Sequence, residues 1–299
     1  MDIRTIGAVS LTVLLWSSAF PGIRAGLAGY DPGHMVLLRF LLASIALAGL
    51  AAVTRMPLPR GRDLPAILGL GLLGIGVYQS GLTFGEQSVT AGAAALIVAL
   101  MPLFMALLAV AALGEHLTAL GWAGSLVSFG GVILVALGQG AAPDGGSSLT
   151  GVALVLGATL ATSIFFVFQK PYLRRYSALQ ITACGIWAAT AVMAVLWGPG
   201  LATAVRAAPL DATLAVVYLG VCPGMIAYVS WAYALSRAPA SILGSVIYLQ
   251  PPLAMVIALV WLGEVPAVES LAGGLIVLAG VLIVSRWGRR PAGVVARPV

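Results

Sequence analysis

Ten hydrophobic runs of about 20 residues follow one another along this chain, and they constrain its fold more than any other feature. An α-helix of that length rises about 30 Å, the thickness of the hydrocarbon core of a bilayer. Only 8% of the residues are charged, against about 25% in soluble domains, so a large water-facing surface is excluded. The sequence predicts an all-α integral membrane protein with ten transmembrane helices. The runs cover residues 5–27, 34–54, 64–85, 90–112, 118–138, 150–170, 178–197, 211–235, 240–262 and 268–286.

Part of the fourth and fifth runs recurs near the C-terminus. A shift of 149 positions aligns Pro102 with Pro251 and the Gly-Glu pair at 114–115 with the pair at 263–264. Matches between apolar residues arise easily by chance in this composition, but matches of Pro and of Gly-Glu do not. The sequence therefore predicts an internal repeat of five helices. The predicted parts are a first half at 1–138, a polar linker at 139–149, a second half at 150–287 and a tail at 288–299.

The positions of Lys and Arg predict the orientation of the chain. With the N-terminus in the cytoplasm, 12 of the 15 basic residues fall in cytoplasmic segments, and only Arg24, Arg39 and Arg206 fall elsewhere. Short cytoplasmic loops of membrane proteins carry such an excess. Both termini of this multi-pass protein are therefore predicted on the cytoplasmic side of the inner membrane. Five helices in each half make the halves inverted, and the basic charge gives no reason to expect a nucleic-acid partner.

Several short motifs in these runs resemble one family. Trp16-Ser17-Ser18 lies in the first run and Arg39-Phe40 in the second, and each half has a Pro followed 12 and 13 residues later by Gly and Glu. This combination resembles the EamA family of the drug/metabolite transporter superfamily. The resemblance implies a ten-helix carrier, most similar to the exporters of aromatic and other amino acids, and not an enzyme.

Prolines near the middle of two corresponding runs predict where a substrate binds. Pro102 lies in the fourth run, and Pro251 and Pro252 lie in the ninth. A Pro inside a helix removes one hydrogen bond and clashes with the preceding turn. Such interruptions at matching depths in two halves point to a binding site between them. We expect these residues to act as kinks or hinges around the site, with a purely structural kink as the alternative.

Aromatic and amide side chains near that depth are the predicted substrate contacts. Buried amides are costly in a membrane unless they find partners, so the Gln side chains are expected to face the interior. Aromatic faces can hold an ammonium group, and amides can donate to a carboxylate. Helix packing is the alternative explanation of the aromatic residues. The candidates are Trp16, Ser17, Tyr78, Gln79, Met101, Phe165, Phe168, Gln169, Tyr228, Trp231, Tyr248 and Gln250.

The charged residues are predicted to serve structure or gating. Arg39 is expected either to extend toward the membrane surface or to pair with Glu86. Glu115 and Glu264 each follow a Gly that can end one helix. The carboxylate can then complement the positive N-terminus of the next helix. Ion pairing in a gate is the alternative role of these two residues. No carboxylate falls in the middle of a run, so facilitated or gradient-driven transport is expected rather than proton coupling.

Other classes of protein find little support in the sequence. Cys184 and Cys222 are isolated in apolar runs, and no His or Cys residues lie at metal-ligand spacing, so neither metal nor cofactor is expected. Motifs of ATPases and of intramembrane enzymes are missing, as are the long loops of a receptor. We expect an exporter of neutral or zwitterionic amino acids and similar metabolites, whose partners are the substrate and the lipid bilayer, with no obligate protein partner. Drug or metabolite efflux by proton antiport is the alternative.

Overall fold

The computed structural model describes residues 2–113, 117–138, 148–235, 237 and 246–287. All regular structure in these segments is helical. Nine of the described helices, some of them interrupted, are long and apolar enough to cross a membrane, and a shorter apolar helix covers Ile247–Leu262. The prediction of an all-α membrane protein is confirmed.

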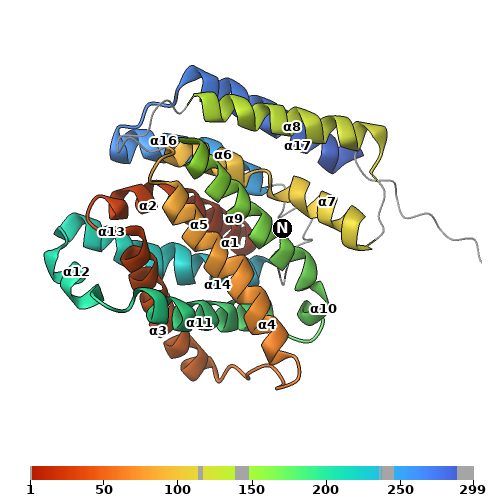
Figure 1. Cartoon of the computed structure of the whole chain (residues 1–299). Coiled ribbons are helices and arrows are strands. Elements are labelled where there is room, and N and C mark those ends of the chain that lie inside the picture. The colour runs from red at the N-terminus through yellow and green to blue at the C-terminus, as the bar shows by residue number, and fades with distance from the viewer. Residues whose placement is uncertain (1, 114–116, 139–147, 236, 238–245, 288–299) are drawn as a thin grey trace, which may run out of the picture.

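The first half contains five such helices, three of them interrupted (Figure 1). The first bends at Ser18, because Pro21 has no N–H to donate to the carbonyl of Ser17. In chain order the elements are α1 (Ile3–Ser17), α2 (Ala19–Leu27), α3 (Pro32–Thr54), α4 (Leu64–Gly71), η1 (Leu72–Val77), α5 (Tyr78–Gly85), α6 (Ala91–Val98), α7 (Met101–Leu113) and α8 (Ala119–Leu137).

The second half adds two short helices between its membrane helices, α10 and α12. Ser177 and Gln180 form a capping box at the start of α11, which satisfies backbone N–H groups there. The elements are α9 (Ser148–Phe168), α10 (Lys170–Leu173), α11 (Ala178–Trp197), α12 (Leu201–Ala207), α13 (Leu210–Val221), η2 (Cys222–Ile226), α14 (Ala227–Leu235), η3 (Ile247–Leu249), α16 (Gln250–Leu262) and α17 (Val268–Trp287).

The prolines interrupt helices in both halves, but in different ways. In the fourth run α6 ends at Val98, the residue whose carbonyl Pro102 cannot bond, and α7 begins at Met101. In the ninth run Pro251 lies in the first turn of α16, where a missing N–H costs little, after the 3₁₀ turn η3. Pro251 and Pro252 thus begin a helix rather than kink its middle, and the role of all three prolines as hinges stays a prediction.

Two π-helical segments, η1 and η2, were not expected from the sequence. A shift of 149 positions places η1 (Leu72–Val77) almost onto η2 (Cys222–Ile226), so both halves widen their helix at the same point. In η2 the cause is Pro223, which cannot donate to the carbonyl four residues earlier. In η1 two glycines make the change of backbone easier. Segments of this kind occur often at functional sites, and these two border the same cavity.

A close and extensive helix crossing joins α8 and α17 across the two halves, side by side at the top of Figure 1. A Cβ atom on Gly131 would lie 2.7 Å from the carbonyl oxygen of Gly273, and one on Gly124 would lie 2.8 Å from that of Gly280. Between them the Ser128 hydroxyl donates to the carbonyl of Val277 at 3.3 Å. Small residues allow such close approach of helices in lipid.

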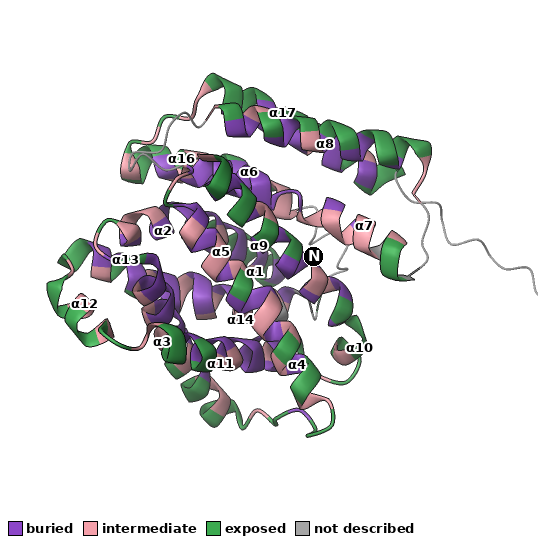
Figure 2. Ribbon diagram, viewed as in Figure 1, coloured by how far each residue is buried: buried purple, intermediate pink, exposed green. Residues whose placement is uncertain are grey.

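The outward faces of these two helices are exposed and apolar. Figure 2 shows exposed residues along the outside of α8 and α17 and buried ones where the two helices meet. Leu126, Ile133 and Leu275 are each more than 60% exposed. A stripe of exposed Leu and Ile on a closed bundle is the surface that contacts lipid tails.

Candidate functional site

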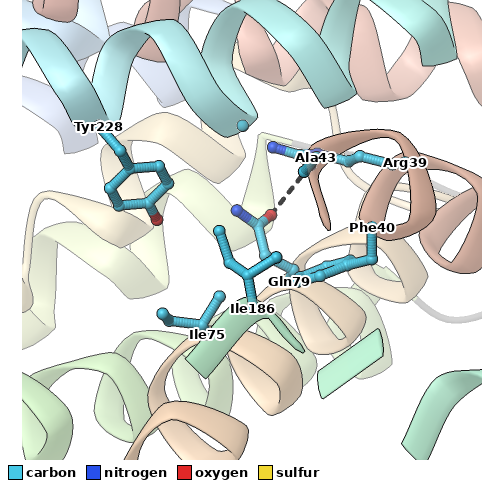
Figure 3. A pocket seen from close by; sticks show the side chains of 8 residues that line it. Arg39, Phe40, Ala43, Ile75, Gln79, Ile186 and Tyr228 are labelled. Atoms are coloured by element: carbon cyan, nitrogen blue, oxygen red, sulfur yellow. Dashed lines mark hydrogen bonds between the residues drawn. The ribbon is translucent and has the colours of Figure 1, made fainter. Parts of the chain in front are cut away.

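A small cavity, with the polar side chains of Arg39, Gln79 and Tyr228 on an otherwise apolar wall, lies between the two halves of the bundle (Figure 3). Helix α3 and the segment from η1 to α5 contribute from the first half, and α11, η2 and α14 from the second. Its free volume is about 10 Å³, close to the space that a single water molecule needs. The structure therefore shows this site in a closed form. The lining residues are Arg39, Phe40, Ala43, Ile75, Gln79, Ile186, Gly224 and Tyr228.

The cavity is lined by equivalent positions of the two repeats. A shift of 149 residues relates Ile75 to Gly224 and Gln79 to Tyr228, and all four border the cavity. The internal pseudo-two-fold axis therefore passes near the cavity. The residue types differ between the halves, so the two sides of the site offer different chemistry: an amide on one side and a phenol on the other.

Arg39 is the charged group of this cavity. Its Nη1 donates to Oε1 of Gln79 at 3.0 Å, and the residue is only 4% exposed. Figure 3 shows Gln79 between Arg39 and Tyr228, with its side-chain nitrogen on the side of Tyr228. Arg39 therefore neither extends to the membrane surface nor bonds to Glu86, which were the two expectations from the sequence. Position along the run could not reveal that Gln79, on another helix, would be the partner.

An aromatic cluster adjoins the cavity on the side of Tyr228. The ring of Trp16 on α1 lies 5.4 Å from that of Tyr228 and 5.3 Å from that of Trp231, measured between centroids. The three-residue spacing of Tyr228 and Trp231 on α14 places both rings toward α1. The structure thus brings together three of the predicted substrate contacts.

The remaining candidates fall into two groups. Ser17, Phe165, Gln169 and Gln250 are buried, Tyr78 and Met101 are partly buried, and the Ser17 hydroxyl donates to its own helix, to the carbonyl of Val13. Phe168, in contrast, is 39% exposed, and the Tyr248 hydroxyl bonds to Ser285 on α17. Phe168 therefore lies on the outside of the bundle, although Phe165, three residues earlier on the same helix, is buried.

Polar contacts, two of them between the halves, lie at the end that the predicted orientation places outside the cell. Nε of Arg24 donates to Oε1 of Glu264 at 2.9 Å, and Nη1 donates to the carbonyl of Glu86 at 2.7 Å. Oε2 of Glu264 accepts from the backbone N–H of Ala91 at 3.1 Å. Glu264 thus complements the start of α6, not of α17 as expected, and its ion pair fits the gate alternative. Glu115 lies outside the described residues.

Glu86 is buried at the same end. It is fully buried, and its two side-chain oxygens have no hydrogen-bond partner among the described residues. Arg24, Glu264 and Arg39 are the charged groups near enough to interact with it electrostatically. Its sequence position at the end of a run concealed this burial.

A second set of contacts holds the opposite end. Asp63 accepts from Nη1 of Arg175 at 3.1 Å and from the hydroxyl of Tyr176 at 2.8 Å. The bond from Tyr176, followed by that from Arg175, lowers the pKa of the Asp63 carboxyl below its ordinary value. These bonds join the segment before α4 to the segment before α11. Within the described ranges, no three His, Cys, Asp or Glu residues gather as metal ligands.

A multi-pass helical bundle with a cavity between two repeated halves is the architecture of a membrane transporter. A sequence model of the EamA-like transporter family matches this chain twice, over residues 3–137 and 149–286. The chain belongs to the EamA-like transporter family.

Related proteins support the same assignment. The chain is 42% identical over 272 residues to the uncharacterized transporter YdfC of Bacillus subtilis, covering 91% of this chain and 88% of that protein. It is 40% identical over 289 residues to a probable terminal-alkyne amino-acid exporter of Streptantibioticus cattleyicolor, covering 96% of each. A solved crystal structure shares the fold with a TM-score of 0.60 at 20% identity, covering 95% of this chain and 96% of the other.

Proposed function

We propose that this protein exports neutral or zwitterionic amino acids and similar small metabolites from the cytoplasm by alternating access. The observation that carries the proposal is the cavity between the repeats, bordered by the equivalent polar residues Gln79 and Tyr228. A site shared by two inverted halves can open to either side when the halves rearrange. The contacts of Arg24 with Glu264 and Glu86 supply a closure that must open for release.

The chemistry around the cavity fits an amino acid better than a bulk ion or a polyphosphate. The rings of Trp16, Tyr228 and Trp231 offer an aromatic surface for a side chain or an ammonium group. Gln79 offers an amide, and Arg39 is the single cation on the cavity wall. The similarity to a probable terminal-alkyne amino-acid exporter supports the same class of substrate.

Proton-coupled efflux is a second candidate, favoured by the burial of Glu86. A buried carboxyl group whose described surroundings contain no hydrogen-bond donor for it favours the protonated form. Such a group could take up a proton on one side of the membrane and release it on the other. Facilitated export needs no such group. The energy source of transport is therefore tested separately from the identity of the substrate.

Proteoliposome transport tests both points. Purified full-length protein should move labelled phenylalanine and leucine down their gradients, and replacement of Tyr228 or Trp231 by Ala should lower the rate at least tenfold. Phe168→Ala is the matched control, because this aromatic ring is exposed, and it should transport normally. Normal transport by both cavity variants would contradict the proposed site. Uphill accumulation driven by a pH jump would establish proton coupling.

A further inference from the structure

We infer that Arg39 binds the free carboxylate of the transported molecule, and that this contact makes a carboxylate a requirement for transport. The inference rests on the proposed function and adds the chemical group that the site recognises. It is carried by the surroundings of Arg39, which hold a buried positive charge next to a cavity.

The Arg39 guanidinium has no carboxylate partner among the residues that the structure describes. Its hydrogen bond goes to the neutral amide of Gln79, and none of the ion pairs in the described part of the chain includes it. A cation removed from water is costly unless a negative charge compensates it. A binding site for an anion uses such a residue, because the ligand supplies the missing charge.

Glu86 and Glu264 do not occupy the hydrogen-bond donors of the Arg39 guanidinium. Glu86 is the carboxyl group within electrostatic range of Arg39, but neither of its oxygens forms a hydrogen bond with a described residue. Glu264, at the same end, is already bonded to Arg24. Neither acid therefore forms a hydrogen bond or an ion pair with the Arg39 guanidinium, whose remaining N–H donors are left for a ligand.

The number of positive charges selects a carboxylate over a phosphate. Arg39 is the one Lys or Arg on the wall of the described cavity, and a single guanidinium matches a singly charged carboxylate through two parallel hydrogen bonds. A phosphate ester carries up to two charges and would need a second cation. Arg24, toward the outer end, is committed to Glu264 and to the Glu86 carbonyl.

The position of Arg39 also orients the rest of the ligand. Gln79 lies between Arg39 and Tyr228 (Figure 3). The ring of Trp16 packs against the rings of Tyr228 and Trp231. A carboxylate on Arg39 would therefore direct the remainder of an amino acid toward the amide and the aromatic cluster. The closed cavity has room for about one water molecule, so the ligand enters when one end of the bundle opens.

Competition experiments with three related molecules test the inference. In proteoliposomes that transport labelled phenylalanine, unlabelled phenylalanine should compete at least tenfold better than phenylalaninamide or phenethylamine, which lack the carboxylate. Arg39→Gln should abolish that preference and raise the KM at least tenfold. Arg39→Lys keeps the charge and should retain the preference with a higher KM. Arg206→Gln, which removes an exposed Arg of α12, is the control.

The outcomes separate a binding role from a structural one. If Arg39 only held Gln79 in place, the variants would lose stability or turnover while acid and amide kept their ratio, and that result would overturn the inference. The melting temperature of each variant in detergent shows whether it folds. If Arg39→Gln does not fold, the acid-to-amide preference of Arg39→Lys decides between the two roles. A wild-type protein that moves phenylalanine and phenylalaninamide alike would overturn the carboxylate site alone. A protein that moves no amino acid would overturn the proposed function as well.

Discussion

Glu264 and Glu86 lie at the same end of the bundle but in different surroundings. Glu264 has an ion pair with Arg24 and a backbone N–H donor, both of which stabilise a negative charge. The Glu86 side chain is buried, and no described residue donates to it, so its environment favours a neutral group. We therefore propose different roles for the two acids: Glu264 holds the outer closure together, and Glu86 lies in its interior as a neutral group.

Removing the charge of Glu264 should loosen this closure. Glu264→Gln leaves the partly buried Arg24 without its counter-charge, which costs about 1 kcal/mol and raises the open fraction about fivefold. A cysteine in place of Ala258, which borders a small cavity next to Glu264, reports the change through its reaction with a membrane-impermeant thiol reagent. Glu269→Gln, at an exposed carboxylate of α17, should leave the labelling rate at the starting value. Equal labelling of both variants would exclude a closing role for Glu264.

At the scale of the helices, the glycines of the α8–α17 crossing differ sharply in what they tolerate. A Cβ atom on Gly131 would meet the Gly273 carbonyl oxygen at 2.7 Å, whereas one on Gly130 would meet nothing within 4 Å. Gly131→Ala should therefore lower the stability by about 1–3 kcal/mol, because the backbones must separate. Gly130→Ala should be neutral or slightly stabilising, since Ala favours a helix. Thermal unfolding in detergent measures both, and similar melting temperatures would contradict the crossing.

The membrane helices could be predicted from the sequence, but their interruptions only in part. Hydrophobic length fixes the approximate position of each helix, because few other structures satisfy the backbone in lipid. The break before Pro102 followed from its missing N–H. The π-helical segments did not, because Gly74 and Pro223 allow a kink, a bulge or a regular turn, and packing against neighbouring helices decides among these.

The candidate site was predictable to a similar degree. Burial of Gln79, Gln169 and Gln250 followed from the cost of an amide in lipid, and all three are buried. The pairing of Arg39 with Gln79, and of Arg24 with Glu264, joins helices distant in sequence. No periodicity within one run indicates such a partner, so tertiary packing had to supply it.

For the whole molecule, the distribution of Lys and Arg makes the orientation testable. Green fluorescent protein fused to either terminus should fluoresce, because it folds in the cytoplasm, and alkaline phosphatase fused to the C-terminus should be inactive. Alkaline phosphatase inserted between α2 and α3 should be active, since this turn is predicted outside. The reverse pattern would invert the assignment of the two ends, and the Arg24–Glu264 closure would then face the cytoplasm.

The crossing of α8 and α17 has a consequence for ancestry. The same shift of 149 positions that relates the halves carries Gly124 to Gly273 and Gly131 to Gly280. The contact of Gly131 with Gly273 and that of Gly124 with Gly280 are therefore equivalent under the pseudo-two-fold rotation. Such self-complementary contact is what two identical subunits make around a two-fold axis. A five-helix ancestor inserted in both orientations would have possessed this interface as a homodimer. Gene duplication and fusion would then have needed no new contact surface, only a join between the chains.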